Sequence, residues 1–259
     1  MDIILKLSEE LGIKKSQAEA AVKLIDEGNT IPFIARYRKE VTGSLNDEVL
    51  RNLYERLTYL RNLEERKETV LNSIEEQGKL TDELKAQILA AETMVAVEDL
   101  YRPYKPKRRT RATIAKERGL EPLANVITLQ MLNTPLEAEA AKFINPEKEV
   151  NTAEDALNGA KDILAESVSD NADFRTHIRE LTMKKGHVTS TAKDPEAESV
   201  YEMYYEFDEP VNKLAGHRIL ALNRGENEKI LNVKVEAPEE DILRFLERKV
   251  ITRDNPNTT

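Results

Sequence analysis

A stripe of apolar residues between positions 47 and 77 constrains the fold more than any other feature of the sequence. The stripe consists of Leu50, Leu53, Leu57, Leu60, Leu63, Val70 and Ile74. Its first four leucines follow heptad spacing, which is compatible with a dimeric coiled coil. The next heptad positions hold Glu64 and Lys67, and the apolar residues continue at a period of 3.6 instead. The pattern therefore favours one long helix over about 47–77, ended by Gly78, that packs its apolar face inside the chain.

Helix start signals recur along the first 186 residues. Ser16 with Glu19 forms a possible capping box, with Gly28 placed to end that helix, and Thr134 and Thr152 open similar patterns. Two further amphipathic helices are predicted from apolar residues at helical spacing. The first contains Leu157, Ala160, Ile163 and Leu164, and the second contains Phe174, Ile178 and Leu181.

The pattern changes after Gly186. Residues 187–198 read as a loop or short strand, and residues 200–207 as a strand or a buried helix. A short helix ending at Gly225, an alternating strand over 230–236 and a helix that starts at Pro238 follow. We predict a mainly α fold with a small β element near the C-terminus. Its regions would be 1–75 (helix-turn-helix-like), 76–186 (a helical body) and 187–259 (mixed α/β).

Composition excludes several classes of protein. The 259 residues include no cysteine, so disulfide frameworks and thiolate zinc sites are excluded. The N-terminus lacks the apolar core of a signal peptide, and no run approaches the ~18 apolar residues of a membrane span. We therefore expect a cytoplasmic protein without membrane contact. The net charge of −9 would repel nucleic acid at long range, so any such contact must be local.

Residues 100–118, LYRPYKPKRRTRATIAKER, oppose that acidic total and are here called the basic strap. The strap contains eight cations and one acid, Glu117. Pro103 and Pro106 predict an extended start, and Thr110 and Thr113 offer hydroxyls where a helix could begin. Cations and aromatic rings on an extended backbone suit phosphates and single-stranded bases. The candidate phosphate-binding residues are Arg102, Lys105, Lys107, Arg108, Arg109 and Arg111, and the candidate stacking residues are Tyr101 and Tyr104. Alternatively, the strap is a solvated loop or is pinned to acidic helices of the same chain.

A second basic cluster surrounds Tyr37. Arg36, Arg38 and Lys39 are its cations, and a helix over 31–40 would place Arg36 and Lys39 on one face. Together with the preceding helix it could form a helix-turn-helix that contacts DNA, or simply a packed pair of helices.

Catalytic motifs are missing from the sequence. The three histidines lie far apart, and neither a phosphate-binding glycine loop nor a GxSxG motif is present. We expect no enzymatic activity, no cofactor, no bound metal and no small-molecule substrate.

Three segments give the sequence a family likeness. They are IPFIARYRKEVTG (31–43), EDLYRPYKPKRRTRATIAKERGLEPLA (98–124) and HRILALNRGENEKILNVKV (217–235). In this order they resemble the hallmark segments of the bacterial Tex family, whose members are described as transcription accessory proteins. The resemblance implies a helix-turn-helix-like start and a helical body that lead into an RNase-H-like domain, a helix-hairpin-helix region and an S1 domain. On this basis we expect the chain to be an N-terminal fragment that lacks those later domains.

The leading hypothesis is a non-enzymatic module of a transcription accessory factor that assists nucleic-acid binding. Binding of RNA or DNA would be weak in this fragment, and the transcription machinery is a possible partner. The alternative is a protein-interaction scaffold that positions the nucleic-acid-binding domains beyond its C-terminus.

Overall fold

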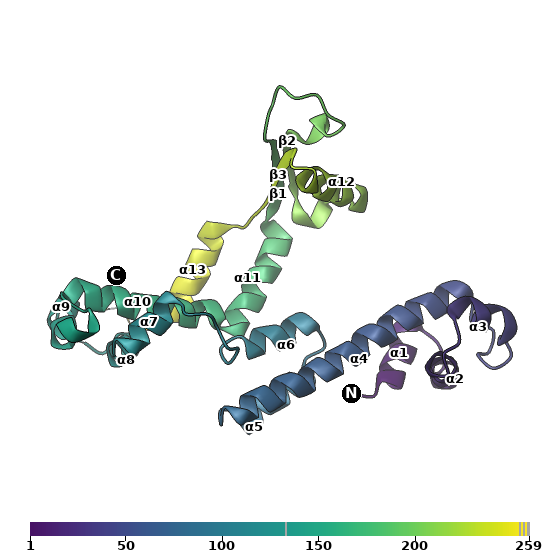
Figure 1. Cartoon of the computed structure of the whole chain (residues 1–259), viewed down its shortest axis with the longest axis horizontal. Helices are drawn as coiled ribbons and strands as arrows, with labels where there is room; N and C mark the ends of the chain where they lie inside the picture. Colours follow the sequence, from purple (N-terminus) through teal and green to yellow (C-terminus); the bar gives the residue numbers. More distant parts are fainter. Residues whose placement is uncertain (133, 254, 256, 258–259) are drawn as a thin grey trace. The chain divides into compact units, whose positions relative to one another are not determined.

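The computed structural model describes residues 1–132, 134–253, 255 and 257, and the prediction of a mainly α fold is confirmed. The chain divides into two compact units, Met1–Tyr104 and Lys105–Thr259. Unit 1 contains six helices in its described residues. They are α1 (Ile3–Leu11), α2 (Lys15–Asp26), α3 (Ile31–Tyr37), α4 (Asp47–Glu76), α5 (Asp82–Ala90) and α6 (Met94–Tyr101) (Figure 1). No helix of the described residues is long and apolar enough to cross a bilayer.

The long helix α4 organises unit 1, as the apolar stripe predicts. The Asn46 side chain caps its N-terminus by accepting from the Val49 amide, and Gly78 follows its end at a φ of +66°. The N-terminal half of the stripe lies in one core with α1, α2 and α3, and the C-terminal half lies in a second core with α5 and α6. An internal packing face is therefore confirmed. Lys67, which breaks the heptad spacing, is buried in this face with 1% exposure.

Two predicted boundaries in unit 1 are wrong. Helix α2 begins at Lys15, so Ser16 lies in its first turn and does not cap it. The side chain of Gln17 accepts from the Lys14 amide and donates to the Gly43 carbonyl, which fixes the earlier start. Helix α3 ends at Tyr37, so Lys39 lies in the following turn and does not share a helical face with Arg36.

In unit 2, α10 (Ala153–Asp170) is the central helix. The helices α7 (Arg111–Glu117), α8 (Glu121–Leu129) and α9 (Leu136–Ala140) pack on it around small residues such as Ala115 and Ala160. The predicted capping box at its start is confirmed, because Thr152 and Asp155 exchange side chain-to-backbone hydrogen bonds of 3.0 Å. Helix α11 (Ala172–Lys185) follows, capped by Asn171.

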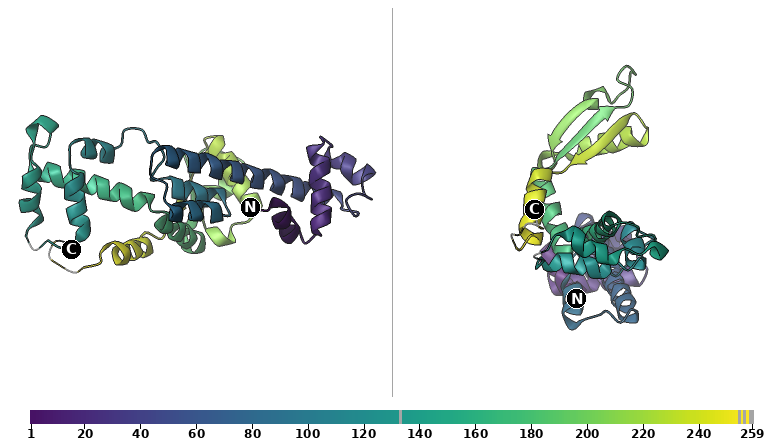
Figure 2. Two further views of the ribbon diagram at one scale, coloured as in Figure 1. Left: turned by 90° about the horizontal axis from the view of Figure 1, so that it is seen from below. Right: turned by 90° about the vertical axis from the view of Figure 1, so that its left-hand side faces the viewer.

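A three-stranded antiparallel sheet forms the predicted β element, in the order β2-β1-β3. The strands are β1 (His187–Ala192), β2 (Glu206–Pro210) and β3 (Leu231–Glu236). Figure 2 shows α12 (Gly216–Asn227) beside this sheet, and α13 (Glu239–Val250) then packs on α11. Residues 200–207 are split between a short 3₁₀ turn, Glu202–Tyr204, and β2, so neither single assignment was right.

Helix α12 runs two residues beyond its predicted stop at Gly225. A Cβ at Gly225 would lie 2.6 Å from Leu231 Cδ1, so this glycine is required by close packing of the helix on β3.

Candidate nucleic-acid interface

The basic strap combines two conformations. Its first residues, Leu100 and Tyr101, complete α6, and residues 102–104 form a turn, so the prediction of an extended start is wrong. Residues 106–110 belong to no helix or strand. Helix α7 then begins at Arg111. The strap thus starts in unit 1 and continues into unit 2.

The position of Tyr101 contradicts its predicted role as a stacking ring. Its side chain faces the core of unit 1 with 7% exposure, and its hydroxyl lies 2.9 Å from Ser73 Oγ. The Arg66 guanidinium lies 5.4 Å from the ring centroid. The ring is therefore occupied by the protein itself. Tyr104 is half-buried against the same core and its carbonyl accepts from Gln77.

Lys107 is bound by acids of α10. Its ammonium contacts the Asp170 carboxylate and lies 3.3 Å from Glu166 Oε1, and the Asp170 side chain is only 9% exposed. This residue fits the alternative in which the strap is pinned to acidic helices. Removing the cation would leave a buried carboxylate without this partner.

Thr110 provides a second anchor three residues later. Its hydroxyl oxygen accepts from the Thr113 amide at 3.1 Å, which caps α7, and it lies 3.1 Å from Glu166 Oε1. Glu166 therefore contacts both Lys107 and Thr110. The backbone between these two residues is fixed to α10 at both ends.

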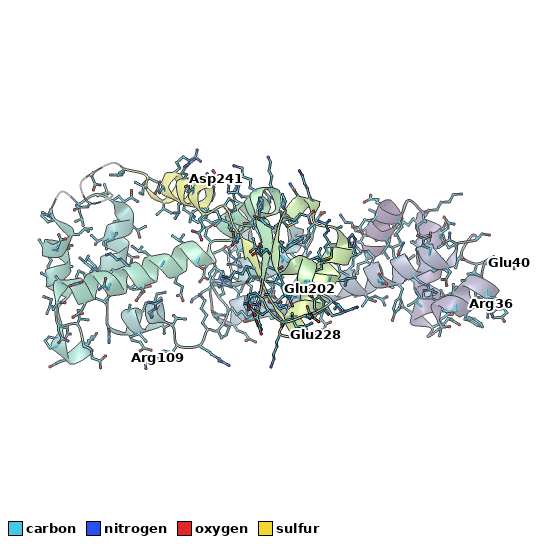
Figure 3. All side chains as sticks on the ribbon, turned by 90° about the horizontal axis from the view of Figure 1, so that it is seen from above. Arg36, Glu40, Arg109, Glu202, Glu228 and Asp241 are labelled. Atoms are coloured by element: carbon cyan, nitrogen blue, oxygen red, sulfur yellow. The ribbon has the colours of Figure 1, made fainter. Side chains whose placement is uncertain are left out.

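Three arginines lie exposed at and beside the anchored segment: Arg108, Arg109 and Arg111. Figure 3 shows Arg109 at the outer edge of the helical layer of unit 2. Its guanidinium lies 2.8 Å from Glu117, but both side chains are more than half exposed. Such a pair contributes little free energy and is readily exchanged. The exposed residues Arg102 and Lys105 precede this group.

The second basic cluster forms an exposed tip at the end of α3 and in the turn after it, where Figure 3 labels Arg36 and Glu40. The Arg38 guanidinium lies 5.2 Å from the Phe33 ring centroid, and that of Arg36 lies 6.0 Å from the centroid of Tyr37. Tyr37 itself is 60% exposed. The Phe33 and Tyr37 rings lie 5.3 Å apart between centroids, so these contacts orient the two guanidinium groups beside a largely exposed aromatic side chain.

Outside the strap, a charged side chain with a shifted pKa caps a helix of unit 2. The hydrogen bonds from Thr152 and from the Asn151 amide lower the pKa of Asp155, so this capping carboxylate stays charged further into acid than an ordinary aspartate. Among the described residues, no group of three histidine or acidic side chains could hold a metal ion.

Comparison with known proteins gives the family. Residues 1–75 match the Tex-like protein N-terminal domain, and residues 133–254 match the Tex central region-like family. The chain is 50% identical over 236 residues to Protein tex of Bordetella pertussis, which covers 90% of this chain and 30% of that protein. It is 46% identical over 244 residues to the transcriptional accessory protein Tex of Neisseria gonorrhoeae, covering 93% of this chain and 32% of the relative.

A human relative, S1 RNA-binding domain-containing protein 1, is 31% identical over 244 residues, which is 90% of this chain and 24% of that protein. The chain thus spans about a third or less of the length of these relatives. Both family matches and the bacterial relatives agree with the likeness of the hallmark segments. The chain belongs to the Tex family, and it contains the family's N-terminal and central regions.

Proposed function

We propose that this chain is a non-enzymatic nucleic-acid-binding module of a transcription accessory protein. The observation that carries the proposal is the group Arg108, Arg109 and Arg111, which is exposed on a backbone segment anchored by Lys107 and Thr110. The names of the relatives support it, since one is a transcriptional accessory protein and another has an S1 RNA-binding domain.

The anchored segment favours binding for an entropic reason. A flexible basic loop loses conformational freedom when it binds, and that loss weakens the complex. Here the ends of the segment are already held by Glu166 and Asp170 of α10, so mainly the arginine side chains remain to be ordered. Each guanidinium can bind a phosphate through two parallel hydrogen bonds. Sequence-independent binding to a nucleic-acid backbone follows from such contacts.

The exposed tip of α3 supplies a secondary surface in this proposal. Tyr37 offers a ring on which a base can stack, and Arg36, Arg38 and Lys39 surround it with charge. Base stacking does not depend on sequence, so this surface would add affinity without selecting a particular site.

A scaffold is the second candidate function, and the Lys107 contacts favour it. A cation held by two carboxylates of α10 stabilises unit 2 and is not free to bind phosphate. In this version the strap fixes the arrangement of the chain, and domains elsewhere in the parent protein bind nucleic acid.

Paired variants separate the two candidates. We expect R108A/R109A/R111A to weaken binding of single-stranded RNA and DNA, measured by fluorescence anisotropy, by at least about tenfold while the melting temperature stays unchanged. K107A should lower the melting temperature with a smaller effect on binding. Equal affinities for the triple variant and the wild type, with lowered melting for both variants, would favour the scaffold instead.

A further inference from the structure

Two apolar side chains near the sheet, those of Val200 and Met203, are largely exposed to solvent. Val200 is 87% exposed and Met203 is 76% exposed, the highest values among the large apolar residues that the structure describes. Single exposed apolar residues are common on protein surfaces. Val200 and Met203 are considered together because they lie three residues apart and flank the buried Tyr201.

The local fold explains why they point outward together. Tyr201 and Tyr204, each one position later, are 6% and 8% exposed and belong to the core beneath the sheet. Val200 and Tyr201 lie in the turn that leads into the 3₁₀ turn Glu202–Tyr204, and Met203 lies within it, so the exposed and the buried side chains alternate along this short segment.

The turn is also held in place by side-chain hydrogen bonds. The Tyr201 hydroxyl donates to Glu228 at 2.9 Å, and the Tyr205 hydroxyl donates to the Ala197 carbonyl at 2.6 Å. Ser199 lies 2.9 Å from the Tyr205 hydroxyl. Figure 3 labels Glu202 and Glu228 in this region. Val200 and Met203 are therefore presented by a fixed turn, which lowers the entropic cost of binding a partner.

The acidic residues around Val200 and Met203 indicate the charge of a partner that this surface would bind. Residues 194–209 contain seven acids and no base. The acids are Asp194, Glu196, Glu198, Glu202, Glu206, Asp208 and Glu209. Two of them contact a histidine or an arginine, since Asp208 lies 2.5 Å from His187 and Glu209 lies 2.5 Å from Arg218. The side chains of Asp194 and Glu202 accept hydrogen bonds from backbone amides. Glu196, Glu198 and Glu202 are exposed beside the apolar pair. This field repels nucleic acid and anionic lipid and attracts a basic surface.

We propose that Val200 and Met203, with the acids around them, form a docking surface for a basic segment of a partner protein that inserts apolar side chains between them. The inference is independent of the strap, which has the opposite charge. A chain with both surfaces could bind nucleic acid through one and a protein through the other.

Methyl NMR tests the proposal on the full chain. The sequence has five methionines, and two of the others, Met131 and Met183, are 60% and 56% exposed and serve as internal controls. The chain, ¹³C-labelled at the methionine methyls, is titrated with an amphipathic lysine–leucine peptide, and M203L assigns the Met203 resonance. We expect Met203 to shift saturably while Met131 and Met183 stay unchanged. A peptide of equal charge with serine in place of leucine should bind at least about tenfold more weakly.

Variants test which side chains contribute to peptide binding. V200S should weaken binding of the leucine peptide at least about tenfold. The melting temperature should not change, because the Val200 side chain is exposed. L129S, at a residue 61% exposed outside the acidic segment, is the matched control and should change nothing. E196Q/E198Q/E202Q should reduce both the affinity and its sensitivity to salt.

Several outcomes would overturn the proposal. They are equal shifts of Met131 and Met183, equal binding of the two peptides, binding unaffected by V200S, or no shift of Met203 up to about 1 mM peptide. A shift of Met203 on addition of single-stranded RNA would assign the surface to nucleic acid and contradict a protein partner.

Discussion

Lys67 places a full charge inside the apolar stripe of α4. Its ammonium lies 2.9 Å from the Leu89 carbonyl and 2.8 Å from Glu64 Oε1, and the second oxygen of Glu64 lies 2.9 Å from the Met1 amine. A buried ammonium is stable only when such partners satisfy it. Lys67 thereby satisfies a carbonyl in the last turn of α5, which has no partner within the helix. The sequence pattern showed Lys67 only as a break in the heptad spacing and could not reveal its contact with the Leu89 carbonyl, because Leu89 lies on another helix.

Removing the Lys67 ammonium should destabilise unit 1. K67A leaves the Leu89 carbonyl and part of the Glu64 carboxylate without a partner and opens a space, so we expect a loss of about 3 kcal/mol in the free energy of unfolding. Urea unfolding followed by circular dichroism measures it. K85A, at an exposed lysine of α5, is the control and should change stability by less than about 0.5 kcal/mol. A comparable small loss for K67A would contradict the structural role.

Two arginine–carboxylate pairs make the stability of unit 1 depend on pH. Hydrogen bonds from Arg61 and Arg56 hold the pKa of Asp26 below its ordinary 3.8 and that of Glu10 below its ordinary 4.5. A lowered pKa means that the stabilisation is complete above the ordinary values and is lost as the pH falls through the lowered ones. We expect the melting temperature of the wild type to drop as the pH falls below 4.5. E10Q/D26N should melt at a lower temperature than the wild type at neutral pH, and its melting temperature should depend less on pH in the acid range. If the melting temperatures of the two proteins fell equally with pH in the acid range, these pairs would contribute nothing to the pH dependence of stability.

At the scale of elements, a glycine sets the distance between α10 and its neighbours. A Cβ at Gly159 would lie 2.3 Å from Leu120 Cδ1 and 3.3 Å from Ala115 Cβ. Leu120 is 1% exposed and has little room to move. The absence of a side chain thus lets α7 and the start of α8 approach α10.

G159A should therefore destabilise unit 2 although alanine favours helices. The gain in helix propensity is about 1 kcal/mol, whereas overpacking costs about 1–3 kcal/mol, so we expect a net loss. Thermal unfolding of G159A is compared with that of N158A, at the exposed neighbouring position. If G159A melted higher than the wild type, the close approach of α7 to α10 would be refuted.

The elements that sequence reasoning predicted well depend on local chemistry. The capping box of Thr152 and Asp155 requires only residues three apart, and it forms as predicted. The Ser16 and Glu19 pair has the same spacing, but Gln17 reaches Lys14 and Gly43 and shifts the start of α2. The contact with Lys14 is local and has the same three-residue spacing, whereas the contact with Gly43 is 26 residues away and no local pattern could indicate it.

The candidate site shows the same limit. The cap of α7 at Thr110 was predictable from threonine, whereas the prolines did not keep residues 100–104 out of helix and turn. The division of roles within the strap was not, because Lys107 and Arg108 are similar residues at adjacent positions. Only the carboxylates of Glu166 and Asp170, some 60 residues later, separate an anchoring lysine from an exposed arginine. The prediction of Tyr101 as a stacking residue was wrong because α6 continues to Tyr101 and its side chain is buried, with the hydroxyl against Ser73.

For the whole molecule, the distribution of charge matters more than its total. The net charge of −9 opposes binding to nucleic acid, yet the strap concentrates cations on one segment and residues 194–209 concentrate acids on another. Contacts with phosphate must therefore be few and local, and each should be visible in the salt dependence of binding.

The most direct test is the slope of log K against log salt concentration for single-stranded and duplex nucleic acid. Neutralisation of about five phosphates predicts a slope of about −4 to −5 on duplex DNA, and R108A/R109A/R111A should make the slope shallower by about 2 to 3. K107A should leave it nearly unchanged, because this lysine is held by α10. A triple variant with the wild-type slope would contradict the account and place the phosphate contacts elsewhere.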